Sequence, residues 1–127
     1  MSDKSIAQKL FIKSNTKFLL VNPPDGYLIQ MGELPPGTIL LSDSSCLVEA
    51  IQVFVSNRSE LEAQLPRLKE LLAPKGMLWV TYHKGTSRTK TDINRDTINA
   101  YAHTIGLEGV AMISIDEDWS ALRLKLV

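Results

Sequence analysis

The segment from Arg58 to Tyr82 constrains the fold more than any other part of this chain. Leucines recur in it at helical spacing, at Leu61, Leu65, Leu68, Leu71 and Leu72. Residues spaced in this way share one face of a helix, which predicts an amphipathic helix packed on a core. Ser59 is the predicted N-cap, Pro66 predicts a kink or a later start, and the Pro74 to Gly76 turn predicts the end.

An apolar run from Met77 to Tyr82 follows this turn and predicts a strand covered on both faces, with Trp79 buried. Further strands are predicted at residues 17–21, 38–41, 50–55, 110–115 and 119–127. Helices alternate with the first strands, which predicts an α/β fold with a mostly parallel sheet of about six strands. The last two strands are joined by a turn too short for a crossover, so we expect them to form an antiparallel hairpin.

Local patterns give two predictions outside this sheet. Residues 1–16 are expected to form an N-terminal helical extension, with Ile6, Leu10 and Phe11 facing inward. Thr91 or Asp92 is the predicted cap of a helix over residues 93–105.

The composition indicates one globular domain spanning residues 1–127, located in the cytoplasm. Fourteen basic and fourteen acidic residues give no net charge, so no nucleic-acid partner is expected. No apolar run approaches the roughly 20 residues of a membrane helix, and no leader segment is visible. Cys46 is the only cysteine and is expected to be a small buried hydrophobe. His83 and His103 have no partner at metal-ligand spacing, so no metal site is predicted.

The stretch from Leu68 to Trp79 joins a leucine-rich helix end, a Pro-x-Gly turn and a strand. This phrase resembles the helix, turn and strand before the fifth strand of class I S-adenosylmethionine-dependent methyltransferases, whose sheet also ends in an antiparallel hairpin. The resemblance runs from Lys17 onward, shortened by about one strand–helix unit. It implies a three-layer Rossmann-like fold.

Four other motifs resemble a small bacterial family of unknown function. They are Lys9-Leu10-Phe11-Ile12-Lys13, Asn22-Pro23-Pro24-Asp25-Gly26-Tyr27, Pro74 to Val80, and Asp116-Glu117-Asp118-Trp119-Ser120. This resemblance implies no particular activity.

The turn after the first strand bears on whether S-adenosylmethionine can bind. A methyltransferase needs a glycine-rich turn there, so that the backbone can approach the cofactor and donate N–H groups. The turn here holds Pro23 and Pro24, which have no N–H, and a single glycine, so no cofactor is predicted. Asp43 follows the second strand, where related folds place an acid for ribose hydroxyls, although we favour a capping role for it.

Polar and conformationally special residues concentrate where the predicted strands end, at the edge where parallel sheets bind ligands. They are Asn22, Asp25, Gly26, Asp43, Lys84, Ser87, Arg88, Lys90, Asp116 and Trp119. The cations between Lys84 and Lys90, with the N-terminus of the helix that follows, could hold a small anion. The alternative is a solvated connector, because any α/β domain carries its long loops on this edge.

Three functions remain open from the sequence. The first is a non-catalytic module that binds a small, possibly anionic, ligand or a protein partner at the carboxyl edge of the sheet, with no catalytic residue. The second is a reduced S-adenosylmethionine-dependent methyltransferase or another nucleotide-using enzyme, with Asp43 as the ribose-binding acid. The third is a subunit that associates through an exposed face of the sheet or helices, and the oligomeric state stays open.

Overall fold

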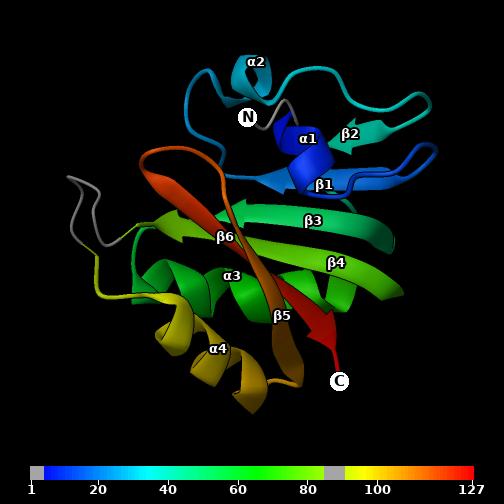
Figure 1. Cartoon of the computed structure of the whole chain (residues 1–127). Helices are drawn as coiled ribbons and strands as arrows, with labels where there is room; N and C mark the ends of the chain where they lie inside the picture. Colours follow the sequence, from blue (N-terminus) through cyan, green and yellow to red (C-terminus); the bar gives the residue numbers. More distant parts are fainter. Residues whose placement is uncertain (1–4, 85–90) are drawn as a thin grey trace.

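A computed structural model describes residues 5–84 and 91–127 of the chain. Its strands are β1 (Lys17–Val21), β2 (Ile39–Leu41), β3 (Val48–Phe54), β4 (Leu72–His83), β5 (Leu107–Ser114) and β6 (Trp119–Leu126). Its helices are α1 (Ile6–Lys9), α2 (Tyr27–Met31), α3 (Arg58–Leu71) and α4 (Arg95–Thr104). Figure 1 shows their arrangement around one sheet.

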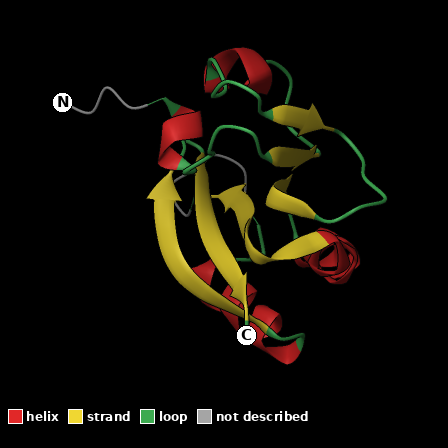
Figure 2. Ribbon diagram, turned by 90° about the vertical axis from the view of Figure 1, so that its right-hand side faces the viewer, coloured by secondary structure: helices red, strands yellow, loops and turns green. Residues whose placement is uncertain are grey.

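The strands form a six-stranded sheet in the order β2-β1-β3-β4-β6-β5 within the described residues. Strands β1 to β4 pair in parallel, and β6 is antiparallel to both β4 and β5. Helices lie on both sides of the sheet, as Figures 1 and 2 show. The predicted α/β fold, with a parallel sheet ending in an antiparallel hairpin, is therefore confirmed.

The core consists of one apolar cluster on each face of the sheet. On one face α3 and α4 pack against β3, β4 and β6, through residues that include Leu61, Leu65, Leu68, Ile98, Ile51, Leu78 and Leu122. On the other face α1 and α2 pack against the same sheet, through residues that include Leu10, Tyr27, Phe18, Phe54 and Trp79. Because Leu78 and Val80 face one cluster and Trp79 the other, β4 is buried on both faces, as its apolar run predicts.

Two predicted helix caps are wrong. Helix α3 starts two residues earlier than the predicted Ser59 cap implies, because Asn57 is extended and its side chain accepts a hydrogen bond from the Glu60 backbone N–H at 2.8 Å. Helix α4 is capped by Asn94, whose side chain accepts a hydrogen bond from the Thr97 backbone N–H, and not by the predicted Thr91 or Asp92.

The two residues expected to cap α4 hold the start of α3 instead. The Thr91 hydroxyl donates to the Ser56 carbonyl at 2.6 Å, and the Asp92 carboxylate accepts from the Arg58 backbone N–H at 2.8 Å. Both residue types commonly cap helices, but the actual partners of these two side chains are thirty-four and thirty-five residues away and are not evident from the local sequence.

Helix α3 ends at Leu71, three residues before Pro74, and the predicted Pro74 to Gly76 turn lies inside β4. Val48 pairs with Leu72 and Ala50 with Met77, so β4 carries extra residues opposite β3 and bulges at this point. A Cβ atom at Gly76 would lie 2.9 Å from the Glu49 carbonyl oxygen, which explains why glycine occupies the bulge. The strand therefore begins five residues before the apolar run predicts.

Two side chains expected inside the protein are exposed. Phe11 has a φ of 59° and is 52% exposed, because the chain turns outward after the buried Leu10. Cys46 is also exposed, in the loop between β2 and β3. Within residues 5–16 the helical part of the predicted extension is α1, which is four residues long.

Truncating Trp79 tests the central position of β4. Its side chain is fully buried, and its indole N–H donates to the Leu10 carbonyl at 3.0 Å. We expect Trp79→Ala to lower the free energy of unfolding by about 3–5 kcal/mol, through lost burial and a cavity. Urea denaturation measures this loss, and Trp79→Phe, which keeps a ring, should lose less than half as much. A loss below about 1 kcal/mol for the alanine variant would contradict the burial of Trp79.

Candidate functional site

The carboxyl edge of the sheet brings Lys84, Asp116 and Trp119 together. Lys84 follows β4, Asp116 belongs to the turn between β5 and β6, and Trp119 is the first residue of β6. The Lys84 backbone N–H donates to the Asp118 carbonyl at 2.8 Å, and its ammonium donates to the Ser114 hydroxyl at 2.6 Å. The end of β4 is thus fastened to the hairpin turn, as expected for a hairpin that returns to this edge.

The Asp116 carboxylate organises that turn. Its Oδ1 accepts from the backbone N–H groups of Asp118 and Trp119 at 2.8 and 2.9 Å, and its Oδ2 accepts from the Gln30 amide at 2.7 Å. Partial burial acts to raise the pKa of Asp116, but these hydrogen bonds, together with nearby Lys84, hold that pKa below its usual value. The carboxylate therefore stays ionised and links α2 to the β5–β6 turn.

Aromatic rings fill the space between α2 and this turn. The Trp119 ring stacks on His83 with centroids 4.0 Å apart and meets the edge of Phe54 at 4.9 Å. Phe54 in turn packs edge-on against Tyr27 at 4.7 Å. The four rings form a continuous row above the carboxyl ends of β3 and β4.

A buried hydrogen-bond chain lies beneath this row. The Tyr27 hydroxyl donates to Gln52 Oε1 at 2.8 Å, and the Gln52 amide donates to the Thr81 hydroxyl at 3.0 Å. Gln52 and Thr81 are fully buried on β3 and β4, and Tyr27 is 1% exposed. Burial raises the pKa of the Tyr27 phenol far above its usual value, so the phenol remains a neutral donor.

The turn after β1 lies just before α2, and its predicted site residues point to solvent. Asn22 and Gly26 adopt positive φ angles of 56° and 81°, which gives the turn its tight reversal. Asn22, Asp25 and Gly26 are exposed. The structure thus places them beside α2, but they are not part of the bonded cluster around Asp116.

Asp43 lies apart from that cluster. It follows β2 and accepts a hydrogen bond from the Ser44 backbone N–H at 2.9 Å. Its carboxylate lies 4.0 Å from the Arg67 guanidinium of α3, and its side chain is 85% exposed. The remaining predicted site residues, Ser87, Arg88 and Lys90, lie outside the described residues.

A hollow of about 350 Å³ opens on the α4 side of the same edge. It is lined by Tyr82, Lys84, Asn94, Arg95, Asp96, Met112 and Ser120. A smaller hollow of about 230 Å³ shares Arg95, Asp96 and Met112 with it. Two cations and one acid line the larger hollow, an arrangement suited to the acidic group of a small molecule.

Sequence reasoning identified Lys84 in this hollow but missed Arg95 and Tyr82. Arg95 is the first residue of α4, directly after the Asn94 cap. Placing the cap correctly would have put this cation at the start of the helix, close to the end of β4. Partial burial raises the pKa of Tyr82, with Arg95 acting against this shift and Asp96 adding to it.

Two other features bear on the kind of site that is present. Among residues 5–84 and 91–127, no group of three or more histidine, cysteine or acidic residues is placed to hold a metal ion. Nor is any helix in the described part of the chain long and apolar enough to cross a membrane.

The structure is similar to solved structures of bacterial methyltransferases. The ribosomal protein L11 methylase of Lactobacillus delbrueckii subsp. bulgaricus has a TM-score of 0.62 at 10% identity, over 95% of this chain and 74% of that one. A TehB-like SAM-dependent methyltransferase from Corynebacterium glutamicum gives 0.60 at 12% identity, over 99% and 90%. The antibiotic-resistance methyltransferase Kmr gives 0.55 at 11% identity, over 99% and 94%.

At such identities the likeness establishes the Rossmann-like methyltransferase fold and leaves the activity open. No protein-family model and no curated protein matches the sequence. The narrower resemblance to a small bacterial family therefore stays a prediction.

Acid titration tests the role of Asp116. The pKa of Asp116 in the folded state is below its unfolded value of about 3.9. The ionised carboxylate therefore stabilises the fold at pH values above this unfolded pKa. This contribution is lost as the pH falls through the folded pKa. We expect Asp116→Asn to cost about 1 kcal/mol at neutral pH, and the difference from the wild type to shrink below about pH 4.

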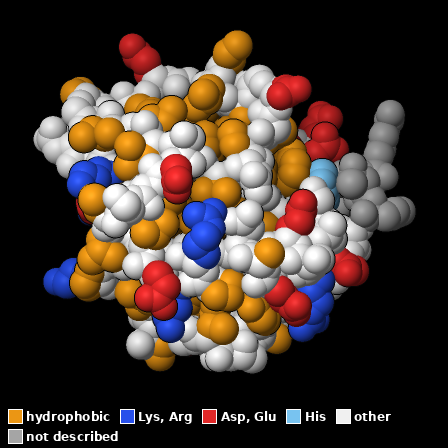
Figure 3. All heavy atoms as spheres, turned by 180° about the vertical axis from the view of Figure 1, so that it is seen from behind, with side chains coloured by type: hydrophobic (Ala, Val, Ile, Leu, Met, Phe, Trp, Pro, Cys, Tyr) orange, Lys and Arg blue, Asp and Glu red, His pale blue; other side chains and the backbone are white. Residues whose placement is uncertain are grey.

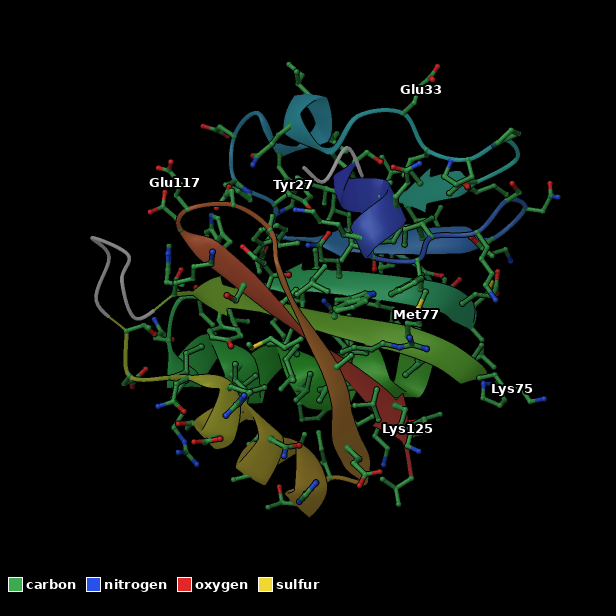
Figure 4. All side chains as sticks on the ribbon, viewed as in Figure 1. Tyr27, Glu33, Lys75, Met77, Glu117 and Lys125 are labelled. Atoms are coloured by element: carbon green, nitrogen blue, oxygen red, sulfur yellow. The ribbon has the colours of Figure 1, made fainter. Side chains whose placement is uncertain are left out.

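Urea denaturation at a series of pH values measures this difference. Glu117→Gln is the matched control, because Glu117 is an exposed acid of the same turn and points away from the protein in Figure 4. A difference between Asp116→Asn and wild type that stays constant into acid would contradict the role of the carboxylate.

Proposed function

We propose that this chain is a non-catalytic binding module with a methyltransferase-like fold, which takes a small anionic ligand or a protein partner at the carboxyl edge of its sheet. The observation that carries this proposal is the burial of Tyr27, which is 1% exposed and hydrogen-bonded to Gln52. Its ring lies over the end of β3, beside the turn where a Rossmann-like enzyme would admit its cofactor.

The residues at that turn do not fit S-adenosylmethionine. Pro23 and Pro24 offer no backbone N–H, and the Tyr27 N–H is already bonded to the Pro24 carbonyl at 3.1 Å. A ligand in this position would have to displace Tyr27 and leave the buried Gln52 oxygen without its donor. No methyl transfer is therefore proposed at this turn.

The hollow beside α4 is the better place for a ligand. Lys84 and Arg95 provide two positive charges against the single charge of Asp96. The ammonium and guanidinium groups come from different elements, so an anion between them would bridge the end of β4 and the start of α4.

A reduced methyltransferase is the second candidate. It is supported by the methyltransferase structures that this chain resembles over nearly its whole length, and by the position of Asp43 after β2. In this candidate Asp43 binds the ribose hydroxyls of the cofactor. Its carboxylate is exposed and would exchange its long contact with Arg67 for these hydroxyls.

Association through an exposed face is the third candidate. Ile39 and Leu40 of the short edge strand β2 are 52% and 39% exposed, and Leu47 nearby is 50% exposed. Hydrophobic side chains gather in the upper left of Figure 3, over this end of the sheet. Light scattering over a range of protein concentrations tests this candidate, and a constant monomer mass would argue against it.

Calorimetric titration separates the first two candidates. We expect no saturable heat with S-adenosylmethionine at millimolar concentration, because Tyr27 and the two prolines exclude the cofactor. A saturable titration with micromolar affinity would contradict the proposal. Loss of that affinity in Asp43→Asn, with Glu70→Gln on the exposed side of α3 as the control, would then support Asp43 as the ribose-binding acid of the second candidate.

Thermal unfolding with phosphate tests the hollow. A ligand that binds only the folded state raises the melting temperature by mass action. We expect phosphate to raise it more in wild type than in the double variant Lys84→Gln, Arg95→Gln, at ionic strength matched with sodium chloride. Arg67→Gln, which removes a cation from α3, should behave as the wild type. An equal rise in all three would indicate the general effect of such salts on burial.

A further inference from the structure

Another hollow lies at the opposite edge of the sheet, where the parallel strands begin. Its volume is about 340 Å³, and its lining comprises Phe11, Lys13, Thr16, Glu49, Ala50, Lys75, Met77 and Arg123. Figure 4 shows Lys75 and Met77 at one end of β4 and Glu117, on the carboxyl edge, at the other side of the molecule. We refer to this hollow as the amino-edge groove.

The apolar part of the groove is held in place by the core. Ala50 is buried, and Met77, two residues before Trp79 on β4, is partly buried beside it. The indole N–H of Trp79 donates to the Leu10 carbonyl at 3.0 Å and so fixes the segment that carries Phe11. Phe11 has a positive φ and is 52% exposed, so it offers the groove an apolar side chain that is open to solvent.

The charges of the groove favour an anion. Lys13, Lys75 and Arg123 are three cations, and Glu49 is the one acid, which gives a net charge of +2 from 3 − 1. One oxygen of Glu49 is directed to the start of β1, where it accepts from the Lys17 backbone N–H at 2.8 Å. The cations are thus neutralised only in part.

Arg123 is the residue that most requires an anionic partner. Its Nε is buried, and within residues 5–84 and 91–127 this atom has no hydrogen-bond partner. Arg123 lies opposite Trp79 in the pairing of β6 with β4, so its side chain shares the sheet face of Trp79. A buried donor without a partner costs free energy, and a planar guanidinium matches a carboxylate or phosphate group through paired hydrogen bonds.

We propose that the amino-edge groove is a binding site for a small organic anion. The carboxylate or phosphate group of the ligand lies against Arg123, Lys13 and Lys75, and its apolar body lies against Phe11 and Met77. The volume is at the lower end of the range for small-molecule sites, which suits a ligand with one ring or a short chain. This site is independent of the proposed function, because it lies at the other edge of the sheet.

Titrations with simple probe molecules, monitored by two-dimensional amide NMR, test this proposal. Benzoate carries a carboxylate, phenyl phosphate carries a phosphate ester, and benzyl alcohol is the neutral analogue. We expect saturable shifts around Phe11 and Met77 with at least one of the anions, and binding of benzyl alcohol that is at least tenfold weaker. Comparison of the two anions identifies which acidic group the groove prefers.

Variants locate the binding on the groove. Arg123→Gln should weaken the anion by roughly tenfold or more, since a hydrogen bond to a charged group is removed. Glu49→Gln should strengthen binding, because it removes the one opposing charge and keeps an acceptor for Lys17. Lys125→Gln is the matched control, since it removes a cation from the same strand outside the groove and should leave the affinity unchanged.

The proposal is overturned if wild type and Arg123→Gln bind the anions equally, if benzyl alcohol binds as tightly as benzoate, or if no probe saturates at millimolar concentration. Should Arg123→Gln fail to fold, the double variant Lys13→Gln, Lys75→Gln replaces it and should weaken binding severalfold. Lys84→Gln with Arg95→Gln should not change this affinity, which separates the groove from the hollow at the carboxyl edge.

Discussion

The two hydrogen bonds of the buried Gln52 side-chain amide are the interaction on which the position of α2 and the β5–β6 turn depends. A polar group fully inside a sheet must find partners, and Gln52 has one on each side, the Tyr27 hydroxyl and the Thr81 hydroxyl. Tyr27 is the first residue of α2, so its hydrogen bond to Gln52 fixes this helix on the sheet. Gln30 of the same helix donates to the Asp116 carboxylate, which shapes the β5–β6 turn. One satisfied amide thereby couples strand, helix and hairpin across nearly the whole chain.

The sequence was sufficient for the architecture because the decisive signals there are periodic and repeated. The leucine stripe of α3, the apolar run of β4 and the short turn before β6 each lead to one interpretation, and the structure confirms all three. Residues at the carboxyl edge could be predicted from this architecture, because the topology of a parallel sheet brings the ends of its strands together. In the turn that follows β5, the Lys84 N–H donates to the Asp118 carbonyl and the Trp119 N–H donates to the Asp116 carboxylate.

What the sequence could not show depends on partners distant along the chain. Thr91 and Asp92 have the chemistry of caps, but they bind the start of α3, thirty-four or thirty-five residues away. Pro74 to Gly76 is a turn by composition, yet pairing with β3 draws it into β4 as a bulge. Arg123 alternates with apolar residues as a solvent-facing residue would, and the register of β6 with β4, which places it opposite the buried Trp79, becomes known only from the structure.

The two edges of the sheet differ because the two faces are unequally covered. Helices α3 and α4 have fourteen and ten residues, whereas α1 and α2 have four and five, so the second face lacks helical cover along much of its length. At the carboxyl edge the rings of Tyr27, Phe54, Trp119 and His83 close that gap. At the amino edge the small Ala50 leaves the gap open. A ligand over β3 at the carboxyl edge must break the Gln52 bond to enter, whereas the amino-edge groove is already open and is lined by Arg123, whose buried Nε has no hydrogen-bond partner among the described residues.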